Sequence, residues 1–199
     1  ALAKEIEKYA VEIARGAGRI LVEYFGKQID VEFKDEHERD PVTAADKATQ
    51  EYLAAEIAKR FPDHGILGEE ASEEDNESEE PAKDVLWVLD PLDGTTNFMN
   101  GLPMFASSIG VLYRGWPMAA ALYIPWPVND GGFVLHSRKG GGCFADDEKV
   151  TVYESDEPVP SRLIGVPGYF GVSQGFTGEL AGKAGEVRTT GSIAYELAM

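Results

Sequence analysis

Two aspartates three residues apart, Asp90 and Asp93, follow an apolar run over residues 85–89 that has the pattern of a buried strand. Pro91 lacks a backbone N–H, so the strand ladder is predicted to end there, and Gly94 permits a tight bend that brings the two carboxylates together. Paired carboxylates of this kind bind hard cations such as Mg²⁺. The alternative is that they only cap a helix or face solvent in a loop.

The residues after the second aspartate offer a site for an anion. Gly94, Thr95 and Thr96 would present backbone amides at the start of a short helix, where the helix dipole is positive. The sequence therefore predicts a cation site and a phosphate site side by side.

Two shorter motifs precede this stretch. Gly68-Glu69-Glu70 follows a short apolar segment and supplies another carboxylate where a strand would end, and residues 40–46 read D-P-V-T-A-A-D. With residues 90–98, D-P-L-D-G-T-T-N-F, these motifs occur in the same order as in the inositol monophosphatase family, which the chain resembles over nearly its whole length.

The resemblance implies a magnesium centre of two or three ions, in which Mn²⁺ would be a possible substitute. The first ion would be held by Glu69, Asp90 and the main-chain carbonyl of Leu92, and the second by Asp90 and Asp93 with one further aspartate. Lys34 would screen the charge of the cluster, although an ordinary exposed lysine explains it equally well.

The resemblance also implies the catalytic roles. Glu69 and Thr95 would orient the attacking water, and Asp46 would form a hydrogen bond with that threonine. The amides of Gly94 and Thr95 would bind the phosphate.

The end of the chain resembles the family element G-[ST]-x-A-x-x-L, in which Gly191, Ser192 and Ile193 begin a helix beside the substrate. Family members continue with a strand and a W-D-x-A-[AG] motif whose aspartate completes the second metal site. Because Met199 falls inside the predicted helix, we expect this chain to lack a C-terminal portion of the domain.

The hydrophobic periodicity predicts the elements that position these residues. We expect helices over residues 2–24 and 44–60, the second capped by Thr43, a strand over 29–33, a solvated acidic loop over 72–80, antiparallel strands over 108–113, 118–123 and 132–136, and a glycine-rich turn over 138–144. The resemblance implies a single α+β domain over 1–199. It would be a layered α-β-α-β-α sandwich with a mainly antiparallel large sheet and a second, smaller sheet.

The bulk properties restrict the partners. A net charge of -17 argues against nucleic acids and anionic membranes, and no apolar run is long enough to span a bilayer, so a cytoplasmic location is expected. The single cysteine excludes an intrachain disulfide. The three tryptophans are predicted to fill the core or an interface, and the region from Trp116 to Trp126 is a candidate interface for the homodimer that the resemblance implies.

Metal-assisted hydrolysis of a small phosphorylated metabolite is the expected activity, with inositol monophosphate as the expected substrate. Fructose 1,6-bisphosphate, histidinol phosphate and adenosine 3',5'-bisphosphate are the alternatives, and lithium inhibition is expected as a family trait. A haloacid-dehalogenase-like phosphatase is disfavoured because Asp90 and Asp93 are three residues apart, whereas that family has its carboxylates two apart. A non-catalytic homologue that binds a phosphorylated ligand is the other functional class.

Overall fold

The computed structural model describes residues 1–28, 31–33, 41–69, 83–126, 131–151, 163–165, 186–188 and 190–198. Its main element is a seven-stranded sheet with the strands in sequential order. The strands are β3 (Gly65–Gly68), β4 (Val85–Asp93), β5 (Ala106–Tyr113), β6 (Trp116–Ile124), β7 (Phe133–Arg138), β8 (Gly142–Ala145) and β9 (Glu148–Val150). All neighbours pair antiparallel except β3 and β4, which are parallel. The predicted antiparallel strands and the glycine-rich hairpin turn are confirmed.

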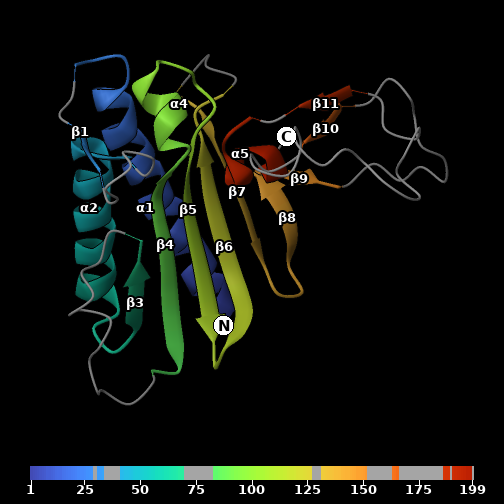
Figure 1. The fold of residues 1–199 in the computed structure, drawn as a ribbon. Coiled ribbons are helices and arrows are strands. Elements are labelled where there is room, and N and C mark those ends of the chain that lie inside the picture. The colour runs from blue at the N-terminus through green and yellow to red at the C-terminus, as the bar shows by residue number, and fades with distance from the viewer. Residues whose placement is uncertain are drawn as a thin grey trace.

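Helices α1 (Leu2–Tyr24) and α2 (Ala44–Arg60) cover one face of this sheet, with α1 over β5 to β7 and α2 beside β3 and β4 (Figure 1). Both match their predicted ranges. Thr43 caps α2 as expected, because its hydroxyl accepts a hydrogen bond from the Ala45 amide at 3.2 Å and Asp46 completes a capping box.

The core lies between these helices and the sheet. Trp87 and the α1 residues Ile6 and Ile13 are fully buried in it, and each such side chain contributes about 2 kcal/mol or more through removal of apolar area from water. Trp116 and Trp126 are 73% and 44% exposed, so of the two predicted roles, core or interface, only the interface role remains for these two. Trp116 is the first residue of β6, and Trp126 follows the end of that strand by two residues.

The remaining elements are short. Strands β1 (Val31–Phe33) and β2 (Pro41–Thr43) pair antiparallel, and β10 (Leu163–Gly165) and β11 (Glu186–Arg188) form a parallel pair. Helix α4 (Thr95–Met99) follows β4, and α5 (Ile193–Ala198) contacts β4, β5 and β6. A mixed α+β fold with a large, mostly antiparallel sheet and a smaller second sheet is therefore confirmed.

Helix α5 lies on the sheet face opposite α1 (Figure 1). Tyr123 packs against Gly18 of α1, whereas its neighbour Ile124 packs against Ala194 and Tyr195 of α5. Since successive side chains of a strand point to opposite faces, the sheet separates the two helices.

One predicted boundary was wrong. Strand β4 does not stop before Pro91 but continues to Asp93, although its pairing with β5 shifts register between Asp90 and Asp93. Proline is tolerated at such an irregularity because no ladder hydrogen bond is needed from it there. The ladder is thus interrupted at Pro91 while the chain stays extended.

Several predictions lie outside the described residues, among them the acidic loop over 72–80 and the position of Lys34. Within the described part of the chain, no helix combines the length and the apolar character required to cross a membrane.

Candidate active site

The predicted acidic residues come together where β3 and β4 end. The parallel register pairs Gly68 with Leu89, and the Glu69 amide donates to the Leu89 carbonyl at 3.0 Å. Glu69 therefore follows β3 at the level where Asp90 continues β4. Because parallel strands end at the same edge of a sheet, two carboxylates distant in the sequence become neighbours.

The pKa of Asp90 is shifted by its surroundings. Burial, the negative charges of Glu69 and Asp93 and a hydrogen bond with Glu69 together raise the pKa of the Asp90 carboxyl to about 8, and burial is the largest cause. Only the Leu92 amide, which donates to Asp90 Oδ1 at 3.2 Å, acts against the shift. Without a cation, this cluster retains a proton near neutral pH.

Asp93 is turned toward the start of α5. Its Oδ2 accepts from the Ser192 hydroxyl at 2.8 Å and from the Ala194 amide at 2.6 Å. Among the residues that the structure describes, no three His, Cys, Asp or Glu side chains are gathered as a ready-made cage for an ion. The three carboxylates are close enough to repel one another, but an ion would have to draw them together.

The donor set fits a hard divalent cation. Glu69, Asp90, Asp93 and the Leu92 carbonyl offer only oxygen ligands, which Mg²⁺ and Mn²⁺ favour. Burial and mutual repulsion both raise the pKa of Asp90, and a bound cation would offset both by stabilising the ionised carboxylates.

A second group of polar residues lies beside the cluster and joins α2 to α4. The Thr95 hydroxyl lies 3.3 Å from Asp46 Oδ1 and 3.0 Å from the Leu92 carbonyl. Asp46 is 2% exposed, and its other oxygen accepts from the amide of Thr43 at 2.8 Å and from the Thr43 hydroxyl. Burial raises the pKa of Asp46, while these hydrogen bonds lower it. The expected hydrogen bond between Asp46 and Thr95 is present.

Gly94 forms the bend between β4 and α4. Its φ of +92° lies in the left-handed region, and an added Cβ would be 2.9 Å from the Met104 carbonyl and 3.0 Å from the Ser192 Cβ. A side chain here would meet both strain and backbone overlap. The backbone amides of Gly94 and Thr95 lie at the start of α4, next to Asp93.

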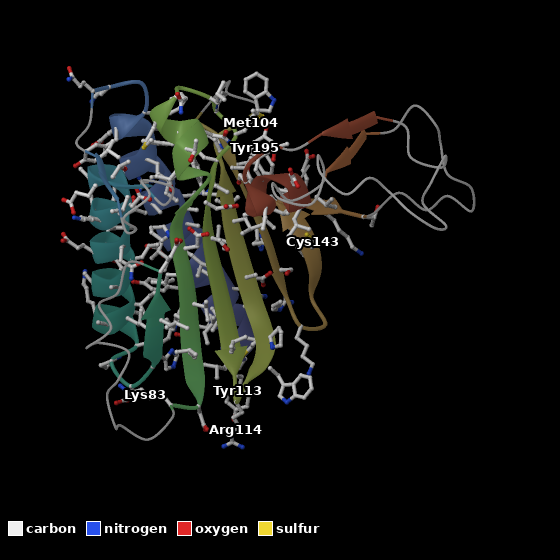
Figure 2. All side chains as sticks on the ribbon, viewed as in Figure 1. Lys83, Met104, Tyr113, Arg114, Cys143 and Tyr195 are labelled. Atoms are coloured by element: carbon white, nitrogen blue, oxygen red, sulfur yellow. The ribbon has the colours of Figure 1, made fainter. Side chains whose placement is uncertain are left out.

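The element around Gly191 reaches the site from the far end of the chain. Gly191 has a φ of +82°, and an added Cβ would be 3.2 Å from the Asn97 amide nitrogen. Ser192 is 2% exposed and contacts Asp93, whereas the side chain of Ile193 is 55% exposed. Tyr195 of the same helix lies near Met104 at this end of the sheet (Figure 2).

Asn97 has a role that the sequence did not reveal. Its side-chain amide donates to the Met104 carbonyl at 2.7 Å and to the Thr190 carbonyl at 2.6 Å. It therefore ties α4 to the segment before α5. Its place in the D-P-L-D-G-T-T-N-F motif was the only signal in the sequence, and the motif does not say which backbone groups it binds.

Comparisons with known proteins identify the family to which this chain belongs. The model of the inositol monophosphatase family matches residues 2–199. The chain is 37% identical over 162 residues to the phosphatase IMPL1, chloroplastic, of Arabidopsis thaliana, which covers 80% of this chain and 42% of that protein. It is 33% identical over 157 residues to the fructose-1,6-bisphosphatase/inositol-1-monophosphatase of Aquifex aeolicus, covering 77% of this chain and 56% of that protein.

The chain thus spans about half the length of these two curated relatives, 42% of one and 56% of the other. The solved structure of an inositol monophosphatase from Anabaena (Nostoc) aligns with a TM-score of 0.76 and 28% identity, covering 100% of this chain and 71% of that chain. The resemblance seen in the three sequence motifs is confirmed, and the chain belongs to the inositol monophosphatase family.

Proposed function

We propose that this protein hydrolyses a phosphate monoester with the help of divalent cations, with Mg²⁺ as the ion. The observation that carries the proposal is the meeting of Glu69, Asp90 and Asp93 beside the start of α4, with the pKa of Asp90 raised to about 8. A carboxyl whose pKa is raised strongly by burial and by neighbouring negative charges is typical of a functional site. The membership in a phosphatase family supports the same activity.

Glu69, Asp90, Asp93 and the Leu92 carbonyl would hold the metal. Bound there, Mg²⁺ supplies charge neutralisation for the phosphate and acidity for a coordinated water. The Leu92 carbonyl accepts from Thr95 through one lone pair, so its second lone pair is available to a cation. Ser192 and the Ala194 amide hold Asp93 in a fixed orientation while it acts as a ligand.

The chain's own residues would position the water and the phosphate. The Thr95 hydroxyl has one proton, which it donates to Asp46 or to the Leu92 carbonyl, so its lone pairs can accept from the water. Glu69, exposed after β3, would take the proton that the water loses. The amides of Gly94 and Thr95 would donate to the phosphate oxygens.

The proposed substrate is a small phosphorylated metabolite, and inositol monophosphate is the first candidate. The name of the Aquifex aeolicus relative, fructose-1,6-bisphosphatase/inositol-1-monophosphatase, supports a sugar or cyclitol phosphate. Fructose 1,6-bisphosphate, histidinol phosphate and adenosine 3',5'-bisphosphate are the comparison substrates. A hydroxyl-rich leaving group would be selected only where its hydroxyls find dedicated partners.

The test is release of inorganic phosphate from inositol 1-phosphate and from the comparison substrates, with and without Mg²⁺. Asp93→Asn should abolish the metal-dependent release. Asp84→Asn is the matched control, because Asp84 lies just before the other end of β4 and pairs with Arg114 at the surface, 2.9 Å away. Equal activity of the Asp93→Asn variant would refute the metal role.

The same experiments separate an enzyme from a binding protein. If the protein binds a phosphorylated ligand with Mg²⁺ but releases no phosphate from any of the four substrates, the non-catalytic reading holds. We retain Mn²⁺ as a substitute, lithium inhibition, a cytoplasmic location and a homodimer as parts of the proposal. The dimer is tested by light scattering of Trp116→Ser, since Trp116 is 73% exposed on the candidate interface.

A further inference from the structure

A cavity of about 400 Å³ lies on the α1 side of the sheet, between α1 and the ends of β6 and β7. Its walls include Arg15, Arg19, Tyr123, Gly131 and Gly132. None of these residues belongs to the acidic cluster or to the groups around it. The volume is in the range of cavities that bind small molecules.

The two arginines are four residues apart on α1, so they lie on the same side of the helix. Arg15 donates to Asp146 Oδ1 at 2.6 Å, and Asp146 is held in turn because its Oδ1 accepts from the Val134 amide at 2.8 Å. Arg15 is therefore fixed at the cavity with part of its guanidinium already paired.

Arg19 differs from the other arginines. Of those whose side chains the structure describes, all but Arg19 form an ion pair with an acid of that same part of the chain: Arg15 with Asp146, Arg60 with Glu5, Arg114 with Asp84 and Arg138 with Glu7. In a chain with a formal charge of -17, a guanidinium left over in this way is unexpected. Within the part of the chain that the structure describes, no hydrogen bond or ion pair occupies its donors, so they are available to a ligand.

The opposite wall is preformed. An added Cβ on Gly18 would be 2.3 Å from the ring of Tyr123, so α1 lies directly against this side chain. The Tyr123 hydroxyl donates to the Gly131 carbonyl at 2.6 Å, which fixes the backbone there. An added Cβ on Gly131, by contrast, would meet nothing within 4 Å, so the chain leaves open space at this point.

We propose that this cavity binds a small phosphate-bearing ligand, with Arg19 as the main contact and Arg15 as the second. A guanidinium presents a planar fork of donors that matches phosphate oxygens. Glu23, one turn beyond Arg19, lines the same cavity and opposes an anion. The site is independent of the proposed hydrolysis, because the two share no residue.

The test is calorimetric titration of inorganic phosphate into protein freed of metal by chelation and dialysis. Without metal the acidic cluster repels phosphate, so the cavity should be the site observed. Arg19→Gln should weaken binding about tenfold, the loss expected for one charged hydrogen-bonding partner. Glu23→Gln, a charge-removing change of the opposite sign in the same cavity, should tighten it a few-fold.

Thermal unfolding of each variant shows whether it is folded, and both positions are exposed on α1, so we expect unchanged midpoints. Citrate in a parallel titration distinguishes phosphate recognition from general anion binding. The proposal is overturned if metal-free protein binds no phosphate, if Arg19→Gln binds as the parent does, if citrate binds as tightly as phosphate, or if Asp93→Asn removes the binding. Failure of the proposed hydrolysis would show instead in the phosphate-release assay.

Discussion

The fold places charged partners of opposite sign beside Glu7 and of the same sign beside Asp90. Glu7 on α1 is 6% exposed, and it accepts from Arg138 Nη1 at 2.8 Å while its other oxygen lies 3.0 Å from His136 Nδ1. At the ends of β3 and β4, Asp90 has Glu69 and Asp93 as its charged neighbours, and both are negative. Glu7 is supplied with a cationic partner, Arg138, and with a histidine contact, whereas Asp90 has negative charges beside it.

This difference in charged partners separates an acid with a structural role, Glu7, from one with a proposed functional role, Asp90. A buried carboxylate is costly unless it is paired, so the Glu7 group joins α1 to β7 and contributes to holding the helix on the sheet. No such partner for Asp90 appears among the charges that shift its pKa. Its cluster is the one that should need a cation from solution, and the two regions should therefore respond differently to neutralising mutations.

The largest effect is expected for Asp90→Asn. This variant removes the acid that both proposed ions share, and the loss of several kcal/mol of transition-state stabilisation, here about 4 kcal/mol, corresponds to a decrease in kcat/KM of about 1000-fold. Without metal near neutral pH, the folded protein must keep Asp90 protonated, whereas the unfolded chain ionises it freely. Asparagine removes this cost, so the free energy of unfolding without metal should stay the same or rise. Phosphate release and urea denaturation measure the two quantities.

Loss of stability rather than activity in Asp90→Asn would mean that the acidic cluster is structural. The control is Asp84→Asn, which changes the same residue type in an exposed surface pair.

Glu7→Gln should show the opposite pattern. The substitution removes the negative charge that pairs with Arg138 and contacts His136, so the Arg138 charge is left without its buried partner. This should lower the free energy of unfolding by about 3 kcal/mol. The activity of the folded fraction should be unchanged, since Glu7 touches no residue of the proposed site. Chemical denaturation together with phosphate release under native conditions checks both statements, and a decrease in kcat of the folded variant would contradict them.

The structural features that could be predicted from the sequence depend on residues close together in the chain. The Thr43 cap and the range of α2 were correct because a hydroxyl before a helical repeat bonds to amides two and three residues away. Strand β4 was cut short at Pro91 because tolerance of a proline depends on register against β5, which lies outside the local pattern.

The unpredicted contacts join distant segments. The bond from the Ala194 amide to Asp93 spans 101 residues, and the one from His136 to Glu7 spans 129. Contacts over such distances do not follow from the helical or strand periodicity of the sequence, so they could not be predicted from it. The roles of Glu69, Asp90 and Asp93 were inferred from the motifs, whereas the geometry that holds Asp93 came only from the packing of α5.

The third prediction concerns pH and metal. The pKa of Asp90 in the folded, metal-free protein is about 8, against an ordinary value of 3.8 for an aspartate in the unfolded chain. Between these values the folded state binds more protons than the unfolded state, so this group stabilises the fold at low pH and the contribution is lost as pH rises toward 8. A metal must displace the proton, and Mg²⁺ affinity should therefore fall by up to about tenfold per pH unit below 8.

Calorimetry of Mg²⁺ binding at several pH values, in buffers of different ionisation enthalpy, measures both the affinity and the protons released. Asp90→Asn should abolish the pH dependence. If proton release per ion is the same in this variant and the parent, Asp90 is not the group that titrates.

The smallest effect is expected for Arg60→Gln, which tests whether burial is the property that separates the two kinds of acid. Arg60 pairs with Glu5 at 2.9 Å and links α2 to α1, but the two side chains are 55% and 51% exposed. An exposed pair of this kind contributes about 0.5 kcal/mol or less and is screened by salt. Glu7 lies on the same helix, only two residues from Glu5. Urea denaturation of Arg60→Gln and Glu7→Gln therefore compares the stability contributed by an exposed ion pair of α1 with that contributed by a buried one. A loss above about 1 kcal/mol for Arg60→Gln, persisting at high salt, would show that joining α1 to its neighbours matters more than the desolvation of the acid.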